Sequence, residues 1–376
     1  MKQPLLSIVI PTKDRYIYLK QLIDYICRNI FSEQVELVIQ DNTVDNTEIE
    51  EFLRSCSYPN LKYFHTVENL SIIENSDLAV LHSTGEYVCY IGDDDCFIPS
   101  LLTVTKEFKK KNVEAGIFPR PMYYWPDVCG SFSTRLTTSY IKPVTFAWKR
   151  INPLTELYKV ITLGGQTLGL MPHLYHGVVK RECLNRLFTQ FSTFFPGPSP
   201  DMANAVALSL SLKKVYYVDY PFIIAGTSFL RIKGNEKGDR QKLESVKFLP
   251  KDTIINWCPD IPQIWTVSTI YAQTLYYTLK KFHREDLFEN FNWNRLYSNL
   301  GAIHWDLFVQ NFKGSLIEYL KISVNILHMR LKRKVVLRLK KQYFSLRGFI
   351  KVQGSMKTVK DYTLNLEKAI GKYIEK

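Results

Sequence analysis

Short apolar runs alternate with stretches of helical periodicity along the first hundred residues. Four runs are apolar and rich in β-branched or aromatic residues, which is typical of buried strands, and the stretches between them repeat apolar residues at three- and four-residue spacing. The predicted strands are 6–10, 35–39, 61–65 and 86–91, and the predicted helices are 16–30, 47–53 and 72–82. Strands that alternate with helices predict an α/β fold with a doubly wound, mostly parallel sheet.

The pattern changes in the second half of the chain. A strand is expected at 173–180, and a helix rich in small residues at 202–212. The segment 226–249 is polar, has no periodicity and predicts a mobile loop or linker. Beyond it, 252–281 and 287–312 have helical spacing.

Length and cysteine content set the broad class of the protein. A chain of 376 residues predicts two domains, or one domain with an extension. Seven cysteines without a CxxC pair predict free thiols in a reducing compartment and no zinc site. We expect a cytoplasmic protein, because Met1 to Leu6 leads directly into a strand and no apolar run reaches the roughly 18–20 residues of a membrane span.

The positive charge is concentrated near the C-terminus. Residues 313–376 hold sixteen Lys or Arg and four acids, a balance of +12 out of +13 for the whole chain. Within them, 323–339 reads as a basic amphipathic helix, which predicts peripheral attachment to an anionic membrane, expected at the inner face of the plasma membrane. Nucleic-acid binding ranks lower, because no nucleic-acid motif accompanies the charge. The alternative that this helix packs on the rest of the protein, with its charged face in solvent, also remains open.

Carboxylates follow three of the predicted strands at the same edge of the sheet. Thr12 and Asp14 follow the first strand, Asp41 the second, and Asp93, Asp94 and Asp95 the fourth. Ligands of open α/β sheets bind at this edge. Consecutive carboxylates suit a hard cation such as Mg²⁺ or Mn²⁺, while an acidic surface turn is the alternative.

These segments resemble the inverting family-2 glycosyltransferases of the GT-A fold. The resemblance covers roughly residues 5–225 and rests on four stretches in order. They are SIVIPTKDR (7–15), ELVIQDNTVDNT (36–47), the stretch 68–95 ending in YIGDDD, and SPDMANAVALSLSL (199–212). The resemblance implies a GT-A domain at 1–228, a mobile linker at 229–250 and a helical basic region at 251–376.

The resemblance also implies roles for individual residues. Thr12 would touch the nucleotide, Asp41 would accept a hydrogen bond from the base, and Asp93 would lie near the ribose. Asp94 would hold the metal with help from Asp95, as a DXD motif does, and Asp201 would be the catalytic base. The remaining expected nucleotide-sugar contacts are Pro11, Asp14, Arg15 and Asn75.

Three positions depart from the family pattern. Gly92 stands where many relatives carry another Asp, so the sequence leaves open which of the three aspartates binds the metal. Lys13 replaces a commoner aromatic residue, and Asn69-Leu70-Ser71 replaces Asn-x-Gly.

The expected reaction is metal-dependent transfer from a nucleotide sugar, with a UDP-sugar as the expected donor. The acceptor would be a saccharide, expected to be lipid-linked, in O-antigen or capsule assembly. A nucleotidyltransferase is the alternative enzyme, although 11–15 lacks the glycine-rich loop that would hold a triphosphate. A non-catalytic module that binds nucleotide sugars or membranes is the third reading.

Overall fold

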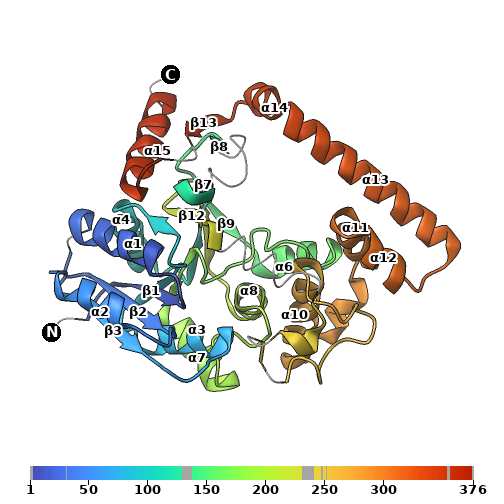
Figure 1. The fold of residues 1–376 in the computed structure, drawn as a ribbon, viewed down its shortest axis with the longest axis horizontal. Coiled ribbons are helices and arrows are strands. Elements are labelled where there is room, and N and C mark those ends of the chain that lie inside the picture. Colours follow the sequence, from blue (N-terminus) through green and yellow to red (C-terminus); the bar gives the residue numbers. More distant parts are fainter. Residues whose placement is uncertain are drawn as a thin grey trace.

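An eight-stranded sheet forms the centre of the protein, which we describe from a computed structural model (Figure 1). The structure describes residues 3–30, 32–128, 138–230, 241–246, 249–250, 252–353 and 356–374. The sheet has the order β3-β2-β1-β4-β10-β6-β11-β9. Its strands are β1 (Leu6–Thr12), β2 (Val35–Asp41), β3 (Leu61–His65), β4 (Tyr87–Tyr90), β6 (Ala115–Ile117), β9 (Trp148–Ile151), β10 (Gly177–Lys180) and β11 (Val215–Val218).

The sheet is mostly parallel and covered on both faces. Its strands run in one direction except β10 and β9, which pair antiparallel with their neighbours. One hydrophobic core lies under α1 (Tyr16–Asn29), α2 (Thr47–Arg54) and α4 (Ser100–Lys111). A second lies under α3 (Ile72–Leu81), α7 (Arg181–Phe191) and α8 (Pro200–Ser211). The predicted doubly wound, mostly parallel α/β fold is therefore confirmed.

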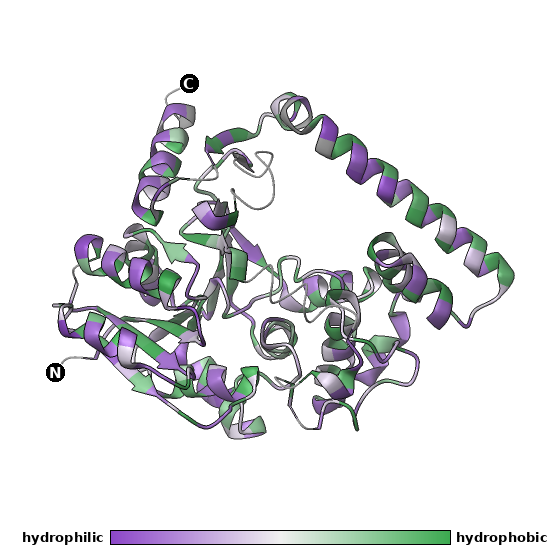
Figure 2. Ribbon diagram, in the orientation of Figure 1, coloured by the Kyte–Doolittle hydropathy of each residue, from purple (hydrophilic) through white to green (hydrophobic). Residues whose placement is uncertain are grey.

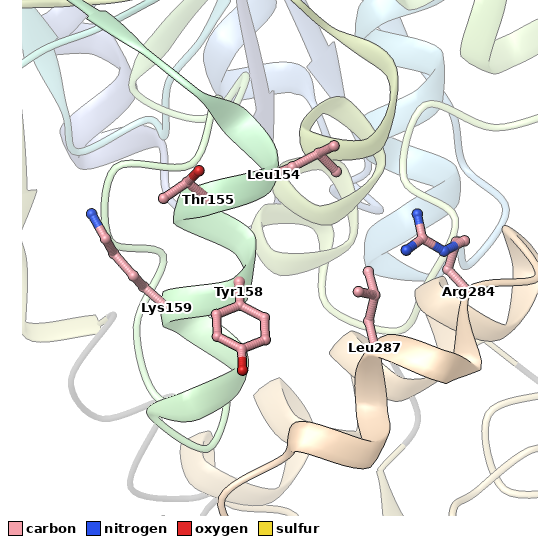
Figure 3. A pocket seen from close by; sticks show the side chains of 6 residues that line it. All are labelled: Leu154, Thr155, Tyr158, Lys159, Arg284 and Leu287. Atoms are coloured by element: carbon pink, nitrogen blue, oxygen red, sulfur yellow. The ribbon is translucent and has the colours of Figure 1, made fainter.

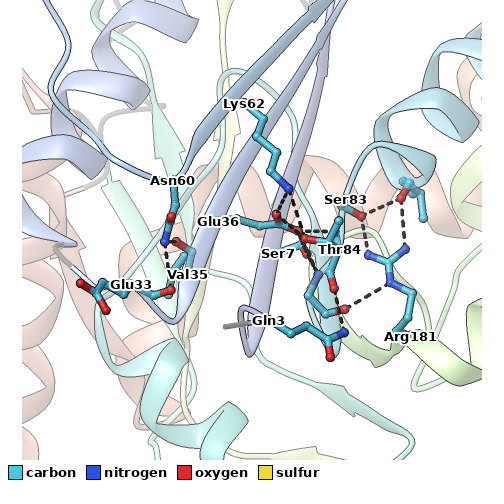
Figure 4. A network of polar contacts seen from close by, with 12 residues as sticks. Gln3, Ser7, Glu33, Val35, Glu36, Asn60, Lys62, Ser83, Thr84 and Arg181 are labelled. Carbon is cyan, nitrogen blue, oxygen red and sulfur yellow. Dashed lines mark hydrogen bonds and ion pairs between the residues drawn. The ribbon is translucent and has the colours of Figure 1, made fainter. Parts of the chain in front are cut away.

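A buried carboxylate fixes the turn that leads into β4 (Figure 4). Glu36 accepts hydrogen bonds from Ser7 Oγ at 2.5 Å, from Gly85 N at 2.9 Å and from the backbone of Thr84, and it pairs with Lys62 at 2.6 Å. Burial opposes the charge, but the hydrogen bonds outweigh it and lower the pKa of Glu36. This network anchors β4 beside β1 at the edge of the sheet opposite the aspartates.

Two smaller sheets extend the central one. β5 (Cys96–Phe97), β12 (Ile223–Thr227) and β7 (Met122–Tyr124) form the order β5-β12-β7. β8 (Thr138–Ile141) pairs antiparallel with β13 (Ile350–Gln353). These pairings join segments that lie far apart in the sequence.

The C-terminal region is helical, as predicted. Its elements are α10 (Val267–Lys281), the 3-10 helix η3 (Glu285–Asn290), α11 (Trp293–Ile303), α12 (Trp305–Asn311), α13 (Leu316–Arg338), α14 (Lys340–Leu346) and α15 (Val359–Ile374). α10 and α6 (Pro153–Thr162) share a core with α8. Figure 1 shows α15 returning beside α1, and Tyr362, Leu366 and Ile370 are buried in the main core.

Some expected elements differ from the structure. Residues 252–266 are turns and irregular backbone instead of helix, and the strand expected at 173–180 begins at Gly177. The expected mobile segment 226–249 lies partly outside the described residues. Its described part includes Leu243 and Val246, which are buried in the core that α6, α8 and α10 share. None of the described helices is long and apolar enough to cross a bilayer. The six cysteines described by the structure are free thiols.

Candidate active site

The ends of β1, β2 and β4 bring the predicted carboxylates together. Thr12 is opposite Asp41 in the β1–β2 ladder, and Val9 is opposite Tyr90 in the β1–β4 ladder. Thr12 Oγ1 donates a hydrogen bond to Asp93 Oδ2 at 2.7 Å. The expected convergence at one sheet edge is therefore present in the structure.

Asp41 is fully buried between two tyrosines. Tyr16 Oη and Tyr63 Oη donate to Asp41 Oδ2 at 2.6 and 2.8 Å, and Thr43 N donates to Oδ1 at 2.8 Å. Burial raises the pKa of both phenols, and the nearby Asp41 raises it further. The two hydroxyls fix the direction in which the carboxylate points.

The loop after β1 joins its neighbours through polar contacts. Asp14 has a φ of +57°, and its backbone N–H donates to Thr43 Oγ1. Lys13 Nζ donates to Asn42 Oδ1 at 3.0 Å and to Asn69 Oδ1 at 2.8 Å. Lys13, which departs from the family pattern, therefore bridges the loops after β2 and β3. Pro11, another predicted nucleotide-sugar contact, lies just before this loop, in β1, and is partly exposed.

Asn75 on α3 offers an acceptor beside the end of β1. Its Nδ2 donates to the carbonyl oxygen of Thr12 at 3.4 Å. Its buried Oδ1 has no hydrogen-bond partner within the described residues. A buried amide oxygen without a partner is costly, so it is suited to accept a hydrogen bond from a ligand hydroxyl.

Arg15 is the counter-ion of the first two aspartates. Its Nη1 lies 3.2 Å from Asp93 Oδ1, and its Nη2 lies 2.7 Å from Asp94 Oδ2. Ser228 Oγ donates to the same Asp94 oxygen at 2.6 Å. Burial raises the pKa of Asp93; Arg15 lowers it, and Asp94 adds to the rise.

Asp95 makes a different set of contacts from its two neighbours. Its Oδ2 accepts from Gly92 N at 2.7 Å and from Tyr175 Oη at 3.0 Å, and lies 2.6 Å from His176 Nε2. Its Oδ1 accepts from Gly226 N at 2.8 Å. Both oxygens are thus engaged by groups of this chain, and the carboxylate ties the turn to β12 and to the segment before β10.

Gly226 allows β12 to approach the aspartates closely. A Cβ atom at this position would lie 1.6 Å from the carbonyl oxygen of Asp94. The same carbonyl accepts a hydrogen bond from Trp125 Nε1 at 2.8 Å. Any side chain at residue 226 would therefore displace the turn that presents Asp94.

Asp201 lies in the first turn of α8 and is held by two hydroxyls. Ser199 Oγ donates to its Oδ1 at 2.5 Å, and Tyr271 Oη on α10 donates to its Oδ2. Burial raises the pKa of Tyr90, and the charges of Asp201, Asp93 and Asp95 add to the rise. Asp201 is therefore in the electrostatic neighbourhood of the β4 aspartates.

Six side chains that contribute to this site are not apparent from the sequence. No motif marks them, although each contacts a predicted carboxylate; they are Tyr16, Tyr63, Tyr175, His176, Ser228 and Tyr271. Ser228 is in the segment interpreted as a linker, and Tyr271 is in the region interpreted as separate from the catalytic domain. No local signal marks Tyr63 either, because it is in the middle of β3 and opposite Ile39 rather than Asp41.

A separate hollow lies between α6 and η3 (Figure 3). Its volume is about 440 Å³, and it is lined by Leu154, Thr155, Tyr158, Lys159, Arg284 and Leu287. None of the predicted site residues lines it. Within the described part of the chain, no group of three His, Cys, Asp or Glu is arranged to hold a metal ion by itself.

Residues 7–150 match the family model described as glycosyl transferase family 2. A curated relative, the putative colanic acid biosynthesis glycosyl transferase WcaA of Escherichia coli K12, is 26% identical over 110 residues. The match covers 29% of this chain and 39% of that protein, so the chain spans about two fifths of the relative's length.

Solved glycosyltransferase structures are also similar to this chain. Staphylococcus aureus TarS 1-349 in complex with UDP-GlcNAc has a TM-score of 0.49 and 15% identity, covering 98% of this chain and 91% of that one. The mannosyltransferase PcManGT of Pyrobaculum calidifontis, in complex with GDP-Man and Mn²⁺, has a TM-score of 0.42 and 14% identity. That match covers 100% of this chain and 88% of the other.

Proposed function

We propose that the chain, whose residues 7–150 match the model of glycosyl transferase family 2, transfers a sugar from a nucleotide donor to a saccharide acceptor with inversion. The observation that carries the proposal is the convergence of Asp41, Asp93 and Asp94 at the carboxyl ends of the parallel strands β2 and β4, on either side of β1. Such an edge is where α/β sheets bind nucleotides. The donor proposed is a UDP-sugar.

The nucleotide would lie across the ends of β1 and β2. Asp41, positioned by Tyr16 and Tyr63, accepts a hydrogen bond from a ring N–H of the base. Asp93, with Thr12 beside it, lies near the ribose. Asn75 Oδ1 accepts from a hydroxyl of the donor. Pro11 at the end of β1 and Asp14 and Arg15 in the loop that follows would contact the nucleotide sugar.

The carboxylates present fit a divalent cation, Mn²⁺ or Mg²⁺. Asp93 and Asp94 already share one guanidinium, so their oxygens face a common positive charge. Such cations are held by one or two carboxylates together with substrate phosphates. Asp94 would hold the cation, because both oxygens of Asp95 accept hydrogen bonds from the chain itself. When bound, the cation would neutralise the charge that develops on the leaving diphosphate.

Asp201 would remove the proton of the acceptor hydroxyl. Ser199 and Tyr271 hold its carboxylate in one orientation, which is what a positioned general base requires. Direct attack by the activated hydroxyl inverts the anomeric carbon. The leaving diphosphate needs no protonation by a carboxylic acid, unlike the leaving group in glycoside hydrolysis.

We also propose the biological setting and the domain division. The relationship to a putative colanic acid glycosyltransferase supports surface polysaccharide assembly, such as O-antigen or capsule, with a lipid-linked acceptor at the cytoplasmic side of a membrane. The catalytic domain would end at residue 228, because Ser228 contacts Asp94. The region 251–376 would complete the site through Tyr271.

The test incubates the protein with a panel of nucleotide sugars, saccharide acceptors and Mn²⁺, and measures the release of nucleoside diphosphate. We expect turnover with one donor, product of inverted configuration by NMR, and loss of turnover in Asp201→Asn. That variant should still be stabilised by the nucleoside diphosphate with Mn²⁺. Its unfolding free energy should rise by about 2.7 kcal/mol when the diphosphate concentration is 100 times its dissociation constant. Asp24→Asn, an exposed carboxylate on α1, is the matched control.

Three results would contradict the proposal. Full turnover in Asp201→Asn would exclude the assigned base. Pyrophosphate release from a nucleoside triphosphate and a sugar phosphate would indicate a nucleotidyltransferase. Stabilisation by a nucleotide sugar without any transfer would indicate a binding module.

A further inference from the structure

The long helix α13 is held by the rest of the protein at both ends. Near its start, Ile322 and Ile326 are buried against α11 and α12. Arg330 donates from Nη2 to the carbonyl oxygen of Gly301 at 2.8 Å and from Nε to that of Ala302 at 3.1 Å. Beyond its end, β13 pairs with β8 and α15 joins the main core. The helix is therefore a fixed element of the fold.

The opposite side of α13 carries an exposed apolar stripe. Its members recur every three or four residues, so they lie on one side of the helix, away from Ile322 and Ile326. They are Leu316, Leu320, Val324, Leu327, Leu331 and Val335, each more than half exposed. Figure 2 shows the hydrophobic positions recurring along the whole of α13. A continuous exposed apolar surface of this kind marks an interaction site.

Basic side chains accompany the stripe. α13 contains six cationic residues and one acid, Glu318. The cations are Lys321, Arg330, Lys332, Arg333, Lys334 and Arg338. A shallow hollow of about 430 Å³ between α11 and α13 is lined by Arg295, Lys332, Arg333 and His328 together with Met329 and Val336. This hollow is on the side of α13 that faces α11. By helical spacing, Lys334 and Arg338 lie on the side of the stripe, and Lys321 and Lys332 flank it, so positive charge accompanies the apolar surface.

We propose that α13 docks the protein on an anionic lipid bilayer. The leucine and valine side chains would enter the boundary between headgroups and acyl chains, and the basic side chains would contact lipid phosphates. With 23 residues at 1.5 Å each, the helix would lie along about 35 Å of the surface. The binding does not depend on the proposed transfer activity, so each can fail without the other.

Two other occupants agree less well with these features. A second copy of the chain would bring two strongly basic helices together, and like charges would oppose the contact. A nucleic acid would match the charge but would leave the exposed leucines in water. A lipid surface is the occupant that satisfies both the charge and the apolar stripe.

The experiment measures flotation of the full chain with vesicles. One set contains equal parts of phosphatidylglycerol and phosphatidylcholine, and the other contains phosphatidylcholine alone. The apolar variant carries Leu320→Gln, Leu327→Gln and Leu331→Gln, all at exposed positions, so its fold should be retained. Its control places Gln at Val67, Ile255 and Leu364, which are exposed elsewhere. The charge variant carries Lys321→Glu, Lys334→Glu and Arg338→Glu, which lie on or beside the stripe, and its control carries Lys106→Glu, Lys110→Glu and Lys213→Glu.

We expect the unaltered chain to bind the anionic vesicles and to dissociate as salt is raised. The apolar variant should bind at least about tenfold more weakly, and the charge variant on the order of a hundredfold more weakly. Both controls should bind like the unaltered chain. No binding to anionic vesicles, or unchanged binding by the apolar variant, would overturn the proposal. A dimer in solution that the apolar variant loses would assign the stripe to a second copy. Binding of single-stranded RNA in place of vesicles, unaffected by the leucine changes, would assign the helix to nucleic acid.

Discussion

Arg15 and Asp94 form an ion pair at the centre of the candidate site, with 2.7 Å between Nη2 and Oδ2. The Asp94 side chain is 2% exposed and the Arg15 side chain 24%. The same guanidinium lies 3.2 Å from Asp93. A buried pair of carboxylates therefore has an internal counter-ion, and a divalent cation at Asp94 would compete with it.

The first prediction concerns this competition. In Arg15→Gln, two buried carboxylates lose their counter-ion, so the metal-free protein should lose about 3 kcal/mol of unfolding free energy. Added Mn²⁺ should therefore raise the melting temperature more in the variant than in the unaltered protein. Lys20→Gln is the matched control, because Lys20 is in α1, which begins directly after Arg15, and pairs with the exposed Glu48. Equal melting temperatures without metal would show that Arg15 does not neutralise the pair.

The second prediction separates the roles of Asp94 and Asp95. Asp94→Asn should abolish the stabilisation by Mn²⁺ with diphosphate and lower turnover by roughly a hundredfold or more, with little loss of stability. Asp95→Asn should instead destabilise the fold by about 2–3 kcal/mol, because an amide nitrogen cannot accept the hydrogen bonds that Asp95 receives.

Calorimetric melting with and without Mn²⁺ would check both variants. If Asp95→Asn melted normally but lost its response to the metal, the assignment of Asp94 as the ligand would be wrong.

The sequence predicts the part of the site that local patterns determine. Thr12, Asp41 and Asp93 directly follow apolar strands, and parallel strands bring their carboxyl ends to one edge. Their convergence could therefore be predicted without coordinates. The distinction between Asp94 and Asp95 could not, because it depends on the partners Ser228, Tyr175 and His176, which come from distant segments.

The C-terminal region shows the same limit. The periodicity of α13 predicts an amphipathic helix, but Ile326, expected with the other apolar residues, is turned toward Gly301 of α11. The pairing of β13 with β8 and the return of α15 to the main core connect residues about two hundred positions apart or more. Local spacing contains no information on such contacts, which depend on the folded shape of the whole chain.

The third prediction tests the contact between Tyr271 and Asp201. Tyr271→Phe keeps the ring and removes the hydroxyl that holds the carboxylate, so kcat should fall about tenfold while KM for the donor stays unchanged. Tyr277→Phe is the matched control, because Tyr277 is also on α10 and donates to a different carboxylate, Asp252. Steady-state kinetics would distinguish the two variants. An equal loss in both would indicate an effect on α10 packing rather than on the base.

The fourth prediction concerns Asp77, which fixes the segment leading to Asp201. Phe194 N donates to Asp77 Oδ1 at 2.8 Å, and burial raises the pKa of Asp77 to about 6. In the unfolded chain an aspartate releases its proton near pH 4, so the folded protein should lose stability as the pH rises from about 4 to 6. Asp77→Asn retains an acceptor for Phe194 and carries no charge.

This variant should therefore be more stable than the unaltered protein at pH 7.5, by about 1–3 kcal/mol, and the difference should shrink toward pH 4. Urea unfolding at several pH values would measure it, with Asp24→Asn as the control for removing an exposed carboxylate. A difference that stayed constant from pH 4 to 7.5 would show that Asp77 does not titrate in this range. Stability falls as the pH rises because the pKa of Asp77 is raised in the folded state. The folded protein binds this proton more tightly than the unfolded chain does, so ionisation of Asp77 opposes folding.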